Sequence, residues 1–122
     1  MKTASFFLPG RLPGANEIRA MLTRKGGYRR YNAVKSKVHA AVALIVAAER
    51  VGRFPSAHVT FEWVEPNMRR DPDNFSQPKA ILDALQHAGV LPNDGWKEIL
   101  SISHKWRVDC DRPGVMVTLV EG

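Results

Sequence analysis

The spacing of apolar residues changes sharply between two neighbouring segments of this chain, and that change restricts the fold more than any other sequence feature. Across residues 32–51, apolar side chains recur every three or four positions, as on one face of a helix. Across residues 58–65, Val59, Phe61 and Trp63 alternate with polar residues, as in a strand with one buried face. The core is therefore expected to combine a sheet with helices.

The remaining segments complete an α+β pattern. Pro78 can occupy the first turn of a helix, and an apolar face follows it as far as residue 88, with Gly89 as the stop. The polar and basic residues 16–30, which include two adjacent glycines, are expected to form a loop. Three further strands are predicted at residues 3–8, 100–108 and 115–120. The predicted order is β-α-β-α-β-β, a four-stranded sheet with two helices on one face.

Length and cysteine content limit the class of protein. With 122 residues, 44% of them hydrophobic, residues 1–122 are expected to form one domain with its own core. A single cysteine, Cys110, excludes an intramolecular disulfide and a cysteine-rich zinc site. The apolar stretch before Pro9 is short for a signal peptide, and no apolar run approaches the roughly 18 residues of a membrane span. We expect no membrane association and a cytoplasmic location.

Charge is divided unevenly along the chain. The formal net charge is +6, and residues 1–53 hold eleven basic and only two acidic side chains. Residues 54–122 hold seven basic and ten acidic side chains. The basic half predicts a polyanionic partner, with uneven but functionless surface charge as the alternative.

Three aspartates in the second half suggest a divalent-metal site. Asp71 and Asp73 lie two positions apart, so in an extended segment their carboxylates point the same way, and Pro72 keeps Asp71 out of the helical region. Asp94 follows in a turn after the second predicted helix. Hard oxygen ligands without nearby cysteine favour Mg²⁺, with Mn²⁺ as a substitute, over zinc. The alternative is that these residues only form turns and a helix cap.

The same region resembles a known family. The run Arg70-Asp71-Pro72-Asp73-Asn74, followed by residues 79–85, residues 88–91 and Asn93-Asp94, is similar to the core signature of the RusA family of Holliday junction resolvases. The specific motif lies within residues 69–96. The resemblance implies a homodimeric, Mg²⁺-dependent endonuclease, common in phages and prophages, that nicks four-way DNA junctions symmetrically during recombination and repair.

The resemblance also assigns individual residues. Asp71, Asp73 and Asp94 fall on the family's three catalytic, metal-binding aspartates, and Lys79 falls on its functionally required lysine. The segment between Asp73 and Lys79 is two residues longer than in the best-known member. A simple ion pair between Lys79 and Asp83, one helical turn later, is the alternative. Asp94 could meet the other two aspartates within one protomer, or the site could be shared across a dimer.

Eight basic residues are candidate contacts for DNA phosphates: Arg24, Lys25, Arg29, Arg30, Lys35, Lys37, Arg69 and Arg70. The expected reaction is metal-assisted phosphodiester hydrolysis of a branched DNA. Two other classes remain open, namely a non-catalytic nucleic-acid-binding protein and a metal-dependent hydrolase of small phosphoesters.

Overall fold

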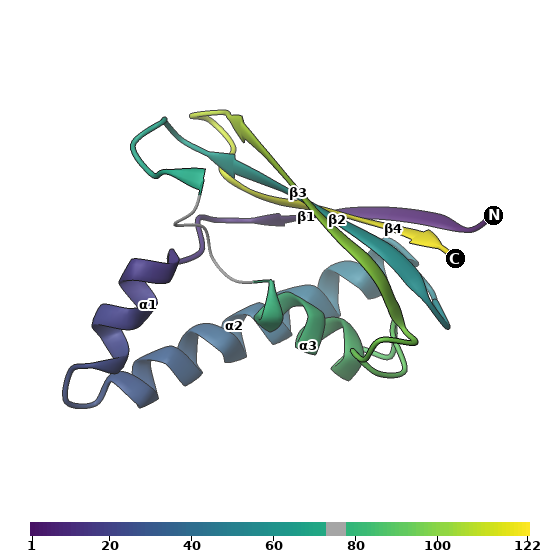
Figure 1. Cartoon of the computed structure of the whole chain (residues 1–122), viewed down its shortest axis with the longest axis horizontal. Coiled ribbons are helices and arrows are strands. Elements are labelled where there is room, and N and C mark those ends of the chain that lie inside the picture. The colour runs from purple at the N-terminus through teal and green to yellow at the C-terminus, as the bar shows by residue number, and fades with distance from the viewer. Residues whose placement is uncertain (73–77) are drawn as a thin grey trace.

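Four strands form one sheet in the computed structural model of the chain, which describes residues 1–72 and 78–122 (Figure 1). The strands are β1 (Thr3–Pro9), β2 (Ala57–Glu65), β3 (Ile99–Val108) and β4 (Gly114–Glu121). Their order in the sheet is β1-β4-β2-β3, with β4 antiparallel to both β1 and β2 and with β2 parallel to β3. The predicted four-stranded sheet and mixed fold class are confirmed.

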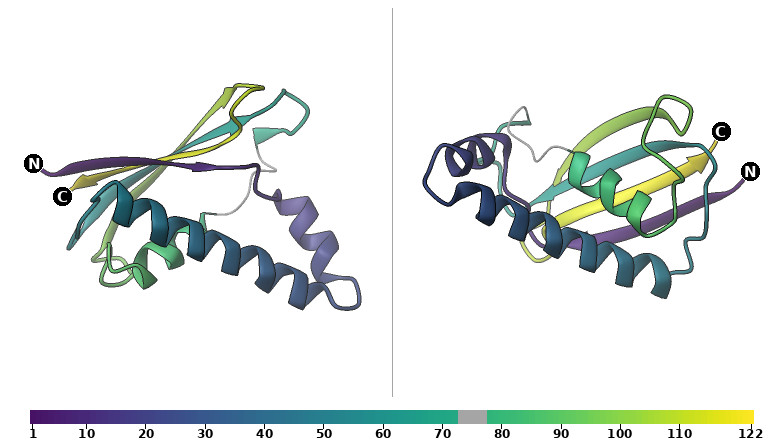
Figure 2. Two further views of the ribbon diagram at one scale, coloured as in Figure 1. Left: turned by 180° about the vertical axis from the view of Figure 1, so that it is seen from behind. Right: turned by 90° about the horizontal axis from the view of Figure 1, so that it is seen from below.

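Three helices among the described residues lie on one side of this sheet (Figure 2). They are α1 (Ala15–Leu22), α2 (Gly27–Ala48) and α3 (Lys79–His87). The two predicted helices correspond to α2 and α3. No helix among the described residues is both long enough and apolar enough to cross a membrane.

The first helix corrects the expectation of a loop over residues 16–30. The side chain of Glu17 accepts a hydrogen bond from the backbone N–H of Gly14 at 3.3 Å, which satisfies a donor at the start of α1. After α1 the chain turns at Gly26, whose φ of 77° is left-handed, and α2 begins at Gly27. A Cβ at Gly27 would collide with the backbone carbonyl of Met21, so this glycine lets α1 and α2 approach closely.

The core lies between the sheet and the helices α2 and α3. From α2, Val38, Val42 and Val46 point inward at a spacing of four residues, as the sequence pattern predicts. From α3, Ile81 and Leu85 are fully buried against the same core. Burying each such side chain contributes about 1.5–3 kcal/mol.

The helix α3 ends where the sequence predicts. Gly89 has a left-handed φ of 79°, and the next backbone N–H, that of Val90, donates to the carbonyl of Leu85 at 3.0 Å. Because β2 and β3 are parallel, the chain must return along the whole sheet between them, and α3 is this crossover. The strand β3 therefore begins at the same end of the sheet as β2.

The strand β3 forms one edge of the sheet and extends beyond the cover of the helices (Figure 2). Phe61 pairs with His104, and Trp63 pairs with Trp106, so the even-numbered residues from Ile102 to Val108 share the face that is buried on β2. The register shifts before Ile102, between the pairs Ala57–Ile99 and His58–Ser101. On β3 itself this face is exposed to solvent along most of its length.

Both chain termini lie at one end of the sheet (Figure 1). Thr3 pairs with Val120 in the antiparallel ladder between β1 and β4. The backbone N–H of Glu121 donates to the carbonyl of Lys2 at 2.9 Å. Neighbouring strands of the sheet thus hold the first and the last residues side by side.

Candidate metal and nucleic-acid site

Asp71 lies near the end of the sheet where β2 and β3 finish. It is exposed to solvent, and a cavity of about 370 Å³ opens beside it, lined also by Met68, Trp106 and Val108. Its carboxylate forms no ion pair with any described residue, which leaves it available to a cation. Asp73, the second expected ligand, lies outside the described residues.

Arg70 is buried directly before Asp71 and fixes the segment in place. Its side chain is 4% exposed, and its Nη2 donates to the carbonyl of Leu12 at 2.9 Å and to Oε1 of Glu17 at 3.1 Å. Its Nε lies 3.3 Å from Oε1 of Glu65, the last residue of β2. This burial corrects the expectation that Arg70 contacts DNA, because a phosphate cannot reach its guanidinium. The residue instead ties Asp71 to β2 and to α1.

Arg11 completes a network of two arginines and two glutamates. Its Nη2 lies 3.0 Å from Oε1 of Glu17, and its Nε lies 3.6 Å from Oε1 of Glu65. Burial raises the pKa of Glu17, but the N–H of Gly14 and the positive charges of Arg11 and Arg70 outweigh it and hold that pKa below its usual value. No sequence motif indicated this network. Its one local signal is the spacing of Gly14 and Glu17, which is typical of a helix start.

Asp94 lies in the predicted turn before β3. It is exposed, and a cavity of about 380 Å³ beside it is lined by Trp96, Leu100 and Ile102. Trp96 is 98% exposed. The Asp94 carboxylate, like that of Asp71, forms no ion pair with a described residue.

Asp71 and Asp94 lie at opposite ends of β3. The cavity of Asp94 includes the first residues of this strand, and the cavity of Asp71 includes the last. A strand of ten residues is about 30 Å long. The chain does not double back after Gly89 to bring Asp94 toward Asp71. Instead, the carbonyl of Glu98 accepts a hydrogen bond from the N–H of Ala57, at the start of β2.

No metal site is complete within the described part of one protomer. Among residues 1–72 and 78–122, no three acidic, histidine or cysteine side chains gather closely enough to hold an ion. Asp71 and Asp94 have the right ligand chemistry for Mg²⁺, since both are exposed carboxylates. Each has a cavity beside it, but one protomer does not place them in the same cavity.

Lys79 begins α3 and forms the ion pair that the sequence offered as its alternative role. Its Nζ lies 3.8 Å from Oδ2 of Asp83, one helical turn later, and its side chain is 73% exposed. Lys79 also lines a third cavity, of about 240 Å³, together with Tyr31 and Lys35 of α2. It lines neither of the two cavities that hold Asp71 and Asp94.

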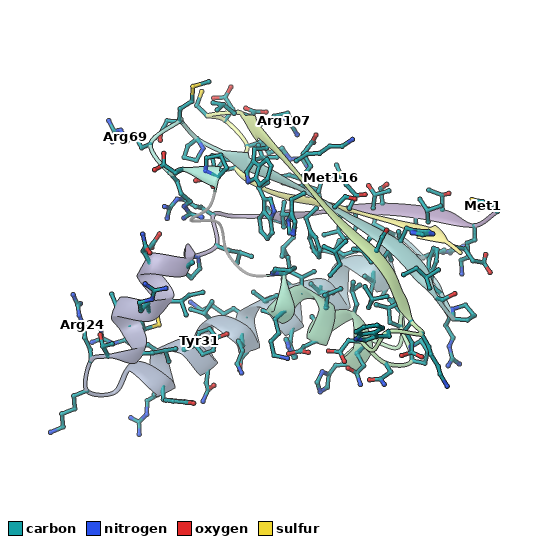
Figure 3. All side chains as sticks on the ribbon, viewed as in Figure 1. Met1, Arg24, Tyr31, Arg69, Arg107 and Met116 are labelled. Carbon is teal, nitrogen blue, oxygen red and sulfur yellow. The ribbon has the colours of Figure 1, made fainter. Side chains whose placement is uncertain are left out.

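The helices α1 and α2 form a basic hairpin that projects beyond the sheet at the Asp71 end (Figures 1 and 3). Its predicted phosphate contacts are Arg24, Lys25, Arg29, Arg30, Lys35 and Lys37. All are exposed except the half-buried Lys35, and none forms an ion pair with a described residue. Arg69, beside Asp71, is also exposed and points outward at this end (Figure 3).

A row of aromatic side chains crosses from β2 to β3. The rings of Trp63 and His104 stack with centroids 6.0 Å apart, and those of His104 and Trp106 lie 6.3 Å apart. Nδ1 of His104 accepts a hydrogen bond from Nε1 of Trp63 at 2.9 Å, and burial lowers the pKa of His104 below its usual value. The alternation along β3 was visible in the sequence, but its contact with β2 depends on the parallel pairing.

Comparison with known proteins leaves the family open. No protein-family model matches this chain. No curated protein matches it either.

Proposed function

We propose that this protein is a Mg²⁺-dependent endonuclease of the RusA type that cleaves four-way DNA junctions in the cytoplasm of a bacterial or phage-infected cell. One observation carries the proposal. The Arg70 network fixes Asp71, which is exposed and forms no ion pair with a described residue, at the end of the molecule from which the basic α1–α2 hairpin projects. A carboxylate that can bind a cation thus lies beside a surface that can bind phosphates.

The aspartates would act as ligands. Because Asp71 and Asp94 of one protomer do not share a cavity, they would hold Mg²⁺, together with Asp73, in the homodimer that the resemblance implies. When bound there, Mg²⁺ would supply a water of lowered pKa and offset charge on the scissile phosphate. Arg70 would hold the Asp71 backbone beside the end of β2 through its ion pair with Glu65, and beside the loop before α1 through its bond to the carbonyl of Leu12. Its role in the reaction is therefore one of positioning.

The basic hairpin would position the DNA without reading its sequence. Contacts to phosphates fix the register of a protein on a duplex, and they release counterions as they form. Arg69 would bind a phosphate next to Asp71. Lys79 would contribute positive charge from the start of α3, where its ion pair with Asp83 is exposed and therefore easily exchanged for a phosphate.

Cleavage of a synthetic four-way junction tests the proposal. Wild type should give paired nicks with Mg²⁺ and none with EDTA. Asp71→Asn should bind the junction normally and cleave it at least a hundred-fold more slowly, since a neutral amide is a poor ligand for Mg²⁺. Asp111→Asn is the matched control, because it makes the same change at an exposed aspartate in the turn between β3 and β4.

The separation of Asp71 and Asp94 favours a second candidate, a non-catalytic protein that binds branched DNA through the basic hairpin. In that case junction binding would persist and no nick would appear with Mg²⁺ or Mn²⁺. Equal cleavage by wild type and Asp71→Asn would also contradict the nuclease proposal.

A further inference from the structure

Two histidines from different helices lie against each other at the surface of the helical layer. His39 is half-buried on α2, and His87 is exposed at the end of α3. Their ring centres lie 4.9 Å apart, and the ring planes are inclined by 43°. Neither residue belongs to the Arg70 network or lines the cavities of Asp71 and Asp94. The pair is therefore separate from the site proposed for Mg²⁺.

The packing of α2 against α3 sets the positions of the two rings. The helices run side by side in the same direction (Figure 2). The start of α3 lines a cavity with Tyr31 of α2, and the residues after its end line another with Ala47. Val42 and Leu85, on the neighbouring turns, are fully buried in the shared core. The backbone that carries both histidines is thus fixed by apolar contacts.

A hydrogen bond fixes the tautomer of His87. Its Nδ1 lies 2.8 Å from the backbone carbonyl of Asp83. A carbonyl oxygen can only accept, so Nδ1 carries the proton and donates it, and Nε2 of the neutral ring keeps a free lone pair. Histidines that bind metal ions almost always donate their other ring N–H in this way, often to a backbone carbonyl. His87 therefore has the supporting contact of a metal ligand.

His39 supplies a second ring at a suitable distance. No hydrogen bond or ion pair joins its imidazole to a described residue. An ion about 2.1 Å from a ring nitrogen is about 3.2 Å from the ring centre, so two imidazoles that bind one ion at right or tetrahedral angles have centres about 4.5–5.2 Å apart. The observed separation of 4.9 Å lies within this range.

The charges near the pair admit a cation. Asp83 lies one helical turn before the histidine of α3, on the same face of the helix. Its Oδ2 is 3.8 Å from Nζ of Lys79, whose side chain is 73% exposed, so this ion pair is weak and leaves the carboxylate able to attract a metal ion. Lys35, one turn before the histidine of α2, places its Nζ over the ring of Tyr31, 5.1 Å from the ring centre.

We propose that His39 and His87 bind a divalent transition metal ion, with Zn²⁺ as the expected ion, which joins α2 to α3. Imidazole nitrogens suit Zn²⁺, Ni²⁺ and Cu²⁺, whereas Mg²⁺ prefers oxygen ligands. No group of three candidate ligands gathers among the described residues, so water completes the coordination. Two of the four ligands of a structural zinc site give roughly half of its binding free energy, which corresponds to a dissociation constant of about 10–100 μM. The site goes beyond the proposed nuclease function and does not depend on it.

Calorimetric titration with ZnCl₂ at neutral pH tests the site. The protein carries no histidine tag and has Cys110→Ser, which removes its one thiol. Mg²⁺ is present in excess so that it occupies carboxylate sites. Wild-type histidines should bind a single Zn²⁺ per chain, and His39→Ala and His87→Ala should each weaken binding about ten-fold or more. The control His58→Ala, at an exposed histidine of β2, should bind as before.

Thermal unfolding gives a second measure of the same site. An ion that binds only the folded state stabilises it, so ZnCl₂ at about ten times the dissociation constant should raise the melting temperature by about 5 °C. His39→Ala and His87→Ala should unfold near the wild-type temperature without metal, because neither ring is fully buried, and should lose the rise. A rise that persists undiminished in both variants overturns the proposal.

Nuclear magnetic resonance of the histidine ring nitrogens identifies the ligands without any substitution. Added Zn²⁺ should shift Nε2 of His87 and one ring nitrogen of His39, and should leave those of His58 in place. Binding that shifts neither of the first two rings overturns the proposal, as does the absence of binding at about 1 mM Zn²⁺, well above the expected dissociation constant.

Discussion

Trp63 donates a hydrogen bond from Nε1 to Nδ1 of His104, 2.9 Å away across the parallel strands β2 and β3. Nδ1 can accept this bond only while it carries no proton. Burial acts in the same direction, because it lowers the pKa of His104 from its ordinary value near 6.5. The pairing of β3 with β2 is therefore coupled to the protonation of one histidine.

Acid should weaken the fold through His104. In the unfolded chain this histidine titrates at its ordinary pKa, so as the pH falls through about 6.5 the unfolded state binds the proton more readily than the folded state. His104→Asn keeps an acceptor beside Trp63 and removes the titration. Between pH 8 and pH 5, the melting temperature of wild type should fall further than that of His104→Asn. Parallel pH profiles of the two proteins would contradict this.

Removing the Arg70 side chain should destabilise the whole domain. Arg70→Met leaves the buried Glu65 without its closest cation and removes the bond to Leu12. Breaking one side of a buried ion pair costs about 3 kcal/mol or more. Urea denaturation should show this loss, whereas Arg69→Met at the exposed neighbouring position should change the free energy of unfolding by less than about 0.5 kcal/mol. Equal stability of the two variants would refute the anchoring role of Arg70.

Binding of junction DNA should depend on salt through the α1–α2 hairpin. Lys25→Ala should lower affinity and should reduce the slope of log affinity against log salt by about 0.9, the value for one lost phosphate contact. Arg53→Ala removes an exposed charge beyond the other end of α2 and should leave that slope unchanged. Fluorescence anisotropy over a range of NaCl concentrations measures both. If only Arg53→Ala reduced the slope, the DNA would bind near the end of α2 opposite the hairpin, and the hairpin would not be the binding surface.

The hairpin itself depends on Gly27. A Cβ there collides with the backbone carbonyl of Met21, so Gly27→Ala should push α1 away from α2. We expect a loss of about 2 kcal/mol in stability and weaker junction binding. Ser36→Ala, at an exposed position of α2, is the control and should be nearly neutral. Retention of full stability by Gly27→Ala, measured by thermal unfolding, would show that the two helices need not approach so closely.

Local patterns in the sequence predicted the elements well but not their relative positions. The alternation of Val59, Phe61 and Trp63 defined β2, and the spacing of Ile81 and Leu85 defined α3, because burial of one face is a local property. The short helix α1 was missed because none of its residues is buried and the glycines after it indicated a loop. The tight turn at Gly26 joins two helices instead.

The sequence could predict the positions of the candidate site residues only in part, because some of them depend on long-range contacts. The spacing of residues 71 and 73 concerns neighbouring positions, which a sequence can show. The distance from Asp71 to Asp94 depends on the parallel pairing of β2 with β3 and on the crossover by α3, which are long-range features. The burial of Arg70 could not be predicted from neighbouring positions either, since it arises from contacts with Leu12 and Glu17, more than fifty positions earlier.

Because Thr3 pairs with Val120, the order of the strands and helices along the chain could be changed without changing the fold. Because β1 and β4 hold the two ends side by side, a short glycine-rich linker could join them and new ends could be opened in the exposed turn at residues 110–112. Such a circular permutant would begin with β4, continue through the linker into β1, and finish with β3. Its C-terminus would then follow directly after the sheet's exposed edge, where a fluorophore or an affinity tag would report on whatever binds there.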